Sequence, residues 1–159
     1  MKLIKLLYLA DREALLRWGR PITTDCYVSM ARGPVLSKAL DLITEGNEPG
    51  VPSQWLNHIS PPSNYEVSLV TDCDREELSI AEEDLIREIY HQLGHMDQWQ
   101  LVRYVHDYCG EWQNPDGSAI PITYSDILRA GNKDESEISA IKEELRSLAG
   151  VGNLYSQSK

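Results

Sequence analysis

The sequence of 159 residues predicts a compact, mainly α-helical domain with a small antiparallel β element, an α+β architecture. Apolar residues recur at helical spacing over most of the chain, and residues that favour helix ends stand at the boundaries of these stretches. Only two short stretches show the alternation of a half-buried strand. The length suits one domain that buries a core without a metal ion or a disulfide. We therefore expect one domain over residues 1–150 and a frayed tail over residues 151–159.

The first predicted helix, residues 2–17, is the one around which we expect the core to form. Apolar residues occupy most of its circumference, which is typical of a helix that is covered from several sides. The residues left to face water are Lys2, Lys5, Arg12, Glu13 and Arg17. Gly19 and Pro21 predict a left-handed cap and a stop. The uninterrupted apolar run, residues 6–10, is too short for a membrane span or a secretory signal.

The small β element is predicted from two stretches. Residues 26–30 alternate and are β-prone, and residues 66–71 alternate in the same way, so we expect these two strands to pair. Between them, residues 35–44 predict a helix with its apolar side inward. The proline- and glycine-rich residues 45–64 predict a loop with one helical turn over residues 54–58.

Two further helices are predicted from their capping residues. Ser79 and Glu82 form the pattern of a capping box, and Gly94 marks the end of that helix. Asp97 is a suitable N-cap for the next helix, residues 98–107.

The last two predicted helices follow a strong turn at residues 114–117. Thr123 or Ser125 begins a short helix that ends at Ala130. Residues 134–148 form the last helix, because their apolar positions recur at intervals of three and four.

The three cysteines, Cys26, Cys73 and Cys109, are an odd number without a CxxC spacing. This pattern is typical of reduced thiols in a cytosol rather than of a disulfide framework. We therefore expect a cytoplasmic protein.

The formal net charge of −10 is unevenly distributed. Residues 1–65 carry seven basic and six acidic residues, whereas residues 66–159 carry eight basic and nineteen acidic ones. Such an acidic surface repels phosphate backbones, so we expect no nucleic-acid partner, and no stretch predicts a membrane partner. The acidic part either serves solubility or favours a basic protein partner, and composition leaves both open.

Three constellations suggest chemistry, and each has a simpler explanation. Glu88, His91 and His95 suggest a metal site, but Gly94 should end the helix before His95, so we expect no metal and no cofactor. A Cys–His–acid site is suggested by His106, Asp107, Cys109 and Glu111. Catalysis needs a nucleophile and a base that lie within hydrogen-bonding distance of each other. Spacing within one segment does not establish such a contact, so an enzyme that uses the His106 region stays the alternative hypothesis.

The last two predicted helices are arranged like a helix-turn-helix around residues 131–133. A recognition helix needs basic residues to approach phosphates and base edges, and this one carries four glutamates against Lys142 and Arg146. A packed helical pair is therefore the expectation. No phosphate-binding loop, dinucleotide fingerprint or hydrolase motif is present.

A combination of motifs does resemble a known family. Residues 2–12 read KLIKLLYLADR, residues 19–23 read GRPIT, and Tyr27 is followed by RGPV at residues 32–35. This combination resembles the Panacea domain, which is found in SocA-like antitoxins and in phage-associated GepA proteins. The segment His106 to Trp112 and residues 126–131 are similar to the later signatures of the family.

The resemblance implies a non-enzymatic antitoxin that neutralises a cognate protein toxin by direct contact. It also leaves open a second mechanism, in which a SocA-like protein acts as an adaptor that delivers the toxin to a ClpXP-type protease. Many members carry a further helix before the KLLYLADR block, and where that cover is lacking the first helix is expected to be open to a partner.

The resemblance also singles out side chains that are not aliphatic core. The matching positions are Asp11, Arg12, Arg20, Tyr27, Arg32, His106, Glu111 and Trp112. One expectation is that they are structural, with an internal Asp11–Arg20 ion pair and with Tyr27 and Trp112 in the core. The other is that they form a toxin-contacting cluster, since Tyr, Trp and Arg anchor many protein interfaces.

Overall fold

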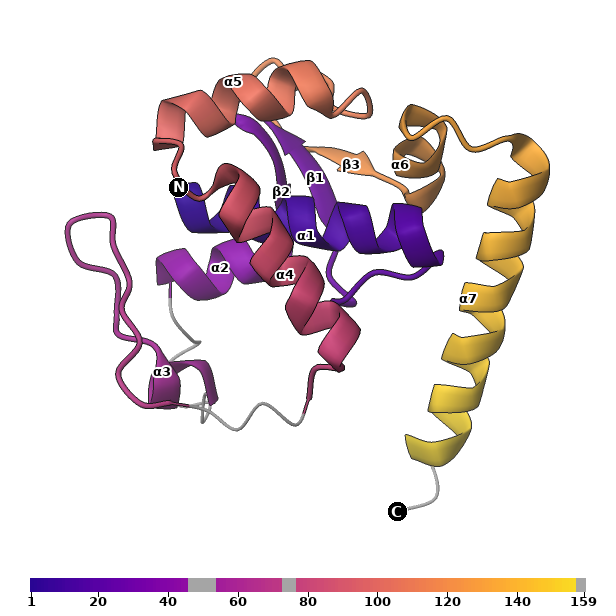
Figure 1. Ribbon diagram of the computed structural model, residues 1–159, viewed down its shortest axis with the longest axis horizontal. Helices are drawn as coiled ribbons and strands as arrows, with labels where there is room; N and C mark the ends of the chain where they lie inside the picture. Colours follow the sequence, from indigo (N-terminus) through magenta and orange to yellow (C-terminus); the bar gives the residue numbers. More distant parts are fainter. Residues whose placement is uncertain (46–53, 73–76, 157–159) are drawn as a thin grey trace.

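The computed structural model describes residues 1–45, 54–72 and 77–156, without the side chains of residues 45 and 149–156. In this part of the chain a small antiparallel sheet is surrounded by helices, so the mainly α fold with a small β element is confirmed. Helix α1 (Lys2–Trp18) lies at the centre and contacts the sheet and three other helices (Figure 1). The central position predicted for this helix is therefore confirmed.

The prediction of which α1 side chains face water was wrong for two residues. Lys5 is 1% exposed and Arg12 is 3% exposed, so both charged groups lie inside the protein. Each has a buried polar partner, which a helical pattern of apolar and charged residues does not reveal. The predicted end of the helix is confirmed, because Gly19 adopts a left-handed conformation with φ of 69° and its N–H donates to the carbonyl of Leu15.

The sheet consists of three short antiparallel strands in the order β2-β1-β3. Strand β1 (Tyr27–Met30) is central, and β2 (Gly33–Leu36) and β3 (Ile120–Ile122) are its edges. Each edge strand contains one proline, Pro34 or Pro121, and an edge strand tolerates proline because one side of it makes no ladder hydrogen bonds.

The predicted pairing of residues 26–30 with residues 66–71 was wrong. Residues 66–71 form only isolated bridges within their own loop, Ser63 with Glu66 and Ile59 with Leu69. The partners of β1 are instead β2, which follows it after a tight turn, and β3, which lies about ninety residues further along the chain. The strand β3 was not predicted, because three residues are too few to show an alternation.

Helix α2 (Ser37–Glu45) begins two residues later than predicted. Val35 and Leu36 pair with β1 and therefore belong to the sheet rather than to the first turn of the helix. Helix α3 (Gln54–His58) is the single helical turn predicted within the loop. Residues 46–53 of that loop and Cys73 lie outside the described residues.

The capping predictions for the later helices are confirmed. Capping boxes begin α4 (Ile80–Leu93) at Ser79, α5 (Gln98–Tyr108) at Asp97 and α6 (Tyr124–Ala130) at Thr123. Helix α7 (Glu135–Ser156) continues beyond the end predicted at residue 148, and the frayed tail stays a prediction.

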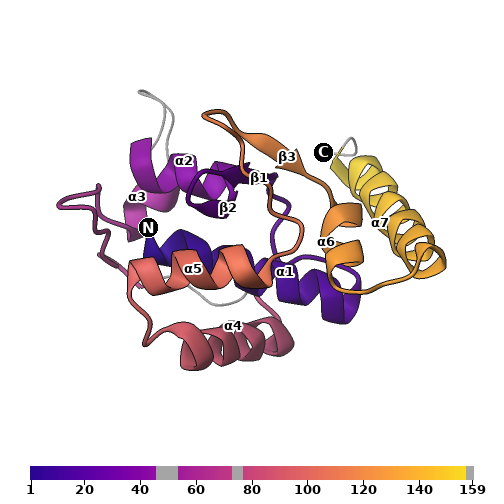
Figure 2. The ribbon, with the colours of Figure 1, turned by 90° about the horizontal axis from the view of Figure 1, so that it is seen from above.

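The helices are arranged around α1 on several sides. Helices α4 and α5 both contact α1, and α6 and α7 lie at the end of the molecule opposite the N-terminus (Figure 2). Ile138 of α7 is buried, and Ile141 and Leu145 pack against the same core. In the described part of the chain, no helix is long and apolar enough to cross a membrane.

Candidate functional site

One face of α1 carries polar groups into the interior. Lys5, Tyr8 and Asp11 follow one another at intervals of three residues, and Arg12 comes four residues after Tyr8, so the helix presents them on one side, and all four are buried. Burial of such groups is costly unless each of them finds a partner. The partners come from the loop before β1, from β1 and β2, and from the segment after α5, so these elements meet at this face of α1.

Glu111 is the centre of the first polar cluster. Its Oε1 accepts hydrogen bonds from the hydroxyl of Tyr8 at 2.6 Å and from Nε of Arg12 at 2.8 Å, and its Oε2 accepts from Nη2 of Arg12 at 3.2 Å. Burial, together with the negative charge of Glu111, raises the pKa of Tyr8, so the tyrosine remains a donor. Burial alone would lower the pKa of Arg12, but the hydrogen bonds to Glu111 outweigh it and raise the pKa. The Arg12 guanidinium also lies 4.8 Å from the ring centre of Tyr108.

Asp11 organises the second cluster. Its carboxylate accepts hydrogen bonds from the backbone N–H and the hydroxyl of Thr23, both at 2.7 Å, and from the hydroxyl of Tyr27 at 2.6 Å. Burial raises the pKa of Asp11, and these hydrogen bonds counteract part of that effect. The expected Asp11–Arg20 ion pair is wrong: Arg20 lies at the surface, where its Nη2 is 3.7 Å from Oε1 of Glu82.

Tyr27 is buried and joins the two clusters through aromatic contacts. Its ring meets the ring of Tyr8 edge to face with centres 5.8 Å apart, and it meets the ring of Tyr124 at 5.6 Å. The expectation that Tyr27 fills the core with its hydroxyl satisfied is therefore confirmed.

Lys5 and His106 lie at the turn between β1 and β2. The Lys5 amine donates to the carbonyl of Pro34 at 2.8 Å, and burial lowers the pKa of this amine to about 8. The His106 ring stacks on the Trp112 ring with centres 3.9 Å apart, and the Trp112 indole N–H donates to the carbonyl of Met30 at 2.9 Å. Trp112 is thus partly buried and ties the segment after α5 to β1.

The groups that suggested catalysis do not form a nucleophile–base pair. The pKa of the Cys109 thiol is raised to about 12 by burial and by the charge of Glu111, so the thiol is protonated. The Nε2 atom of His106 is buried and has no hydrogen-bond partner among the described residues, and burial lowers the pKa of this imidazole. Glu111 is occupied by Tyr8 and Arg12. A reactive cysteine needs the opposite electrostatics, a thiolate stabilised by nearby positive charge.

The suggested metal ligands do not converge. Helix α4 ends at Leu93, so His91 lies on the helix and His95 follows it, as the position of Gly94 predicts. Across residues 1–45, 54–72 and 77–156, no three His, Cys, Asp or Glu side chains are grouped in a way that would hold a metal ion.

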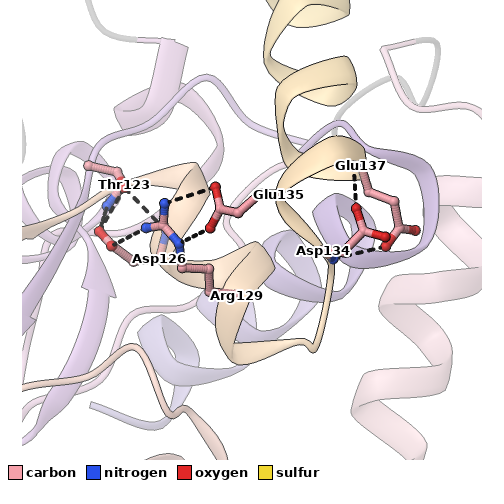
Figure 3. Close-up of polar contacts among 6 residues, drawn as sticks. All are labelled: Thr123, Asp126, Arg129, Asp134, Glu135 and Glu137. Carbon is pink, nitrogen blue, oxygen red and sulfur yellow. Dashed lines mark hydrogen bonds and ion pairs between the residues drawn. The ribbon is translucent and has the colours of Figure 1, made fainter.

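The two helices that resemble a helix-turn-helix are joined by acidic and basic side chains that pair with one another (Figure 3). Asp126 caps α6 by accepting from Thr123, and Arg129 pairs with Glu135 at the start of α7 at 2.6 Å. Asp134 and Glu137 cap α7 reciprocally. Arg129, which could have met a phosphate, is therefore neutralised locally, and the pair is a packed helical corner.

Two surface features were not expected from the sequence. An apolar groove of about 640 Å³ lies between the first turn of α1, α2 and the loop that carries Tyr65. Beside Met1, whose Sδ is 4.0 Å from Nη1 of Arg32, the exposed Arg32 guanidinium lies 5.4 Å from the ring centre of Trp99 on α5. The distribution of apolar residues along the sequence gives no signal for either feature, because both depend on which loops are brought together.

Of the eight positions singled out by the sequence, four belong to the buried clusters, two stack on each other beside the clusters, and two lie apart. Asp11, Arg12, Tyr27 and Glu111 belong to the buried clusters, and Trp112 stacks on His106 beside them. Arg20 and Arg32 are exposed and lie apart from the clusters. Sequence reasoning missed Lys5, Tyr8, Thr23 and Trp99, of which Lys5 and Tyr8 share their helical face with Asp11 and Arg12.

Comparison with known proteins gives one match. The family model for antitoxins that are SocA-like and carry a Panacea domain matches residues 3–113, more than half of the chain. The match ends after Trp112, so it includes all eight positions but neither α6 nor α7, and the signature proposed at residues 126–131 lies outside it. No curated protein and no solved structure matches the chain. The chain therefore belongs to the SocA-like antitoxin family with a Panacea domain.

Proposed function

We propose that this protein is an antitoxin that neutralises a cognate protein toxin by direct protein–protein binding in the cytoplasm. The observation that carries the proposal is the family match over residues 3–113. The role of antitoxin is inferred from the SocA-like family, and the partner of such an antitoxin is another protein.

The geometry of the buried clusters supports a binding protein rather than an enzyme. Their carboxylates, Asp11 and Glu111, are occupied by hydrogen bonds from within the domain, and the Cys109 thiol is protonated. An enzyme would hold such groups available to a substrate in a cleft. Here they hold α1, β1 and the segment after α5 together, so we infer that they shape the surface that meets the partner.

The test is growth of cells that express the adjacent open reading frame, with and without this protein. We expect the neighbouring gene product to arrest growth and this protein to restore it. The matched control is a variant with a disrupted core, Leu15→Asp, which should be expressed but fail to protect. If the neighbouring product is not toxic in several hosts, or if protection does not depend on a folded protein, the proposal is wrong.

The same cells separate neutralisation from delivery to a protease. Under neutralisation the half-life of the toxin is unchanged or longer when this protein is present, and the two proteins co-purify. Under delivery to a ClpXP-type protease, the half-life of the toxin falls and the fall requires the protease. We expect the first result.

A further inference from the structure

Two arginines differ from all the other described arginines in their ion pairing. Six of the eight arginines in the described residues form ion pairs with a carboxylate. Arg32 and Arg103, by contrast, form no ion pair within the described part of the chain. Both are exposed. In a chain with a formal net charge of −10, two arginines without an ion pair are unusual.

The two arginines lie near the same tryptophan. The Arg32 guanidinium lies over the Trp99 ring at 5.4 Å from its centre, a cation–π arrangement. Trp99 and Arg103 are four residues apart on α5, so they lie on the same face of that helix. Trp99 is 49% exposed although it is one of the largest apolar side chains. We call Arg32, Trp99 and Arg103 the arginine–tryptophan patch.

The fold places the arginine–tryptophan patch on structured elements. Arg32 lies in the turn between β1 and β2, where the Gly33 that follows it packs closely against Val105 of α5. Helix α5 lies across the end of this hairpin (Figure 1). The guanidinium of Arg32 and the indole of Trp99 are therefore held together before any partner arrives, which lowers the entropic cost of binding.

The acidic residues nearest to the patch, Asp97 and Asp107, leave the two guanidinium groups without an ion pair in the described residues. Asp97 accepts hydrogen bonds from the backbone N–H groups of Trp99 and Gln100, both at 2.8 Å, so its carboxylate is bound to the start of the helix. Asp107, one turn beyond Arg103, forms no ion pair with it in the described residues. The pKa of Asp97 is lowered mainly by its hydrogen bond from the backbone of Gln100 and also by the charge of Arg103. The patch thus offers two guanidinium groups without an ion pair and an exposed aromatic ring.

We propose that the arginine–tryptophan patch is a docking surface for a carboxylate-bearing segment of a protein partner. Arginine pairs with carboxylates in a two-pronged geometry, and Trp and Arg are the residue types that contribute most to binding at protein interfaces. The partner segment carries Asp or Glu side chains against the two arginines and an apolar group against Trp99. A nucleic acid would also present anions, but the acidic remainder of the protein repels its extended phosphate backbone.

This inference rests on the proposed function only in taking the toxin as the partner that supplies the segment. Its first test does not need the toxin. The probe is a short polyglutamate peptide, titrated into the full-length protein at low salt, and the readout is the NMR signals of the arginine side-chain Nε–H groups and the tryptophan indole N–H groups. We expect saturable shifts at Arg32, Arg103 and Trp99, and none at Arg87, an exposed arginine that is already paired with Glu83 and Asp84.

The outcome of this titration decides the class of ligand. Shifts that are absent, or that are as large at Arg87 as at Arg32, would overturn the proposal. A DNA duplex of equal charge is titrated in parallel, and tighter saturation by DNA would also overturn it, because the ligand would then be a nucleic acid.

The second test uses the product of the adjacent open reading frame. In a complex with this protein, we expect Arg32→Glu to weaken binding at least about tenfold, because it places like charges opposite one another. The matched control, Arg87→Glu, should change the affinity less than about twofold. Equal affinities for wild type and Arg32→Glu would show that the toxin binds elsewhere. If the wild-type protein does not bind this product at all, the proposed function is wrong. The peptide titration alone then tests whether the arginine–tryptophan patch binds carboxylates.

Discussion

At the scale of single residues, Glu111 has the largest predicted effect on stability. Its carboxylate accepts hydrogen bonds from both Tyr8 and Arg12 in the interior. Arg12 is buried there, so water does not replace a lost partner. Removing one partner of a buried ion pair leaves an uncompensated charge. We therefore expect Glu111→Ala to lower the free energy of unfolding by about 3–5 kcal/mol, measured by urea denaturation.

Two further variants make this prediction specific. Replacing the whole group by apolar residues, with Tyr8→Phe, Arg12→Met and Glu111→Leu together, removes the charges as well as the hydrogen bonds. This triple variant should be more stable than Glu111→Ala, although it changes three residues. Glu135→Ala, which breaks only the exposed pair with Arg129, should unfold close to wild type. A loss from Glu111→Ala no larger than that from Glu135→Ala would contradict the burial of the cluster.

Lys5 gives the protein a dependence of stability on alkaline pH. Burial lowers the pKa of its amine in the folded state from 10.5 to about 8. Between these two values the unfolded chain binds more protons than the folded chain, so the free energy of unfolding contributed by Lys5 rises with pH. Below about pH 8 the amine is charged in both states and this gain is absent.

The measurement is the urea midpoint of wild type and of Lys5→Met between pH 8 and 10. Wild type should gain stability relative to Lys5→Met over this window, by about 2 kcal/mol. The comparison removes most of the effect of Cys109, whose raised pKa acts in the opposite direction in both proteins. Parallel pH profiles for the two proteins would show that the folded-state pKa of Lys5 is not lowered.

The burial of Lys5 and Arg12 could not be predicted from the sequence, and the reason is general. A helical pattern assigns charged residues to the solvent side because an unpaired buried charge is very costly. Their partners, the carbonyl of Pro34 and the carboxylate of Glu111, lie twenty-nine and ninety-nine residues away. Only the folded topology brings them together. The family resemblance did single out Arg12 and Glu111, and it did so without indicating that they bind each other.

At the scale of elements, the turn between β1 and β2 depends on Gly33. Its φ of +96° is unfavourable for other residues, and an added Cβ would lie only 2.5 Å from Cγ2 of Val105 on α5. We expect Gly33→Ala to lower the free energy of unfolding by roughly 3 kcal/mol, combining backbone strain with overpacking. Urea denaturation measures this loss.

Gly117 provides a matched control for this substitution. Its φ of +98° is nearly the same, but no atom of the described part of the chain lies within 4 Å of an added Cβ. Gly117→Ala should therefore lower the free energy of unfolding only by the backbone strain, about 1–2 kcal/mol. The difference between the two variants measures the packing of the hairpin against α5. If the two losses are equal, the close approach of Gly33 to Val105 makes no contribution.

Helices were predicted from the sequence more accurately than strands, for a physical reason. The capping boxes at Ser79, Asp97 and Thr123 are formed by residues three positions apart, so the sequence contains the whole interaction. The partner of a strand is not contained in its own sequence. Residues 66–71 alternate as well as residues 27–30 do, yet the latter pair with residues 33–36 and 120–122. Val35 and Leu36, which follow the hairpin turn and pair with β1, were interpreted instead as the start of a helix.

At the scale of the whole molecule, the matched family segment and the remainder differ in role. Residues 3–113 contain α1, the hairpin of β1 and β2 and both buried clusters. Residues 114–159 add β3 to the sheet, and α7 packs against the core through Ile138, Ile141 and Leu145. Most of the acidic excess lies before this later part, because residues 66–113 carry twelve acidic and three basic residues, whereas residues 114–159 carry seven and five.

The uneven charge leads to a prediction for the kinetics of binding. Residues 66–159 carry eight basic and nineteen acidic residues, and an acidic surface of this kind accelerates the encounter with a basic toxin. Raising the ionic strength from about 0.01 M to 0.15 M shortens the Debye length from about 30 Å to 8 Å. Long-range attraction is then screened, whereas contacts made within the complex are affected much less.

We therefore expect the association rate constant with the toxin to fall about tenfold or more over this range of salt, while the dissociation rate constant changes little. Stopped-flow measurements at several salt concentrations determine both constants. A variant with Glu143→Gln and Glu144→Gln, two exposed residues of α7, should show a weaker dependence of association on salt and an unchanged stability. An association rate that rises with salt would mean that the toxin is acidic, in which case the arginine–tryptophan patch would be the main site of electrostatic attraction.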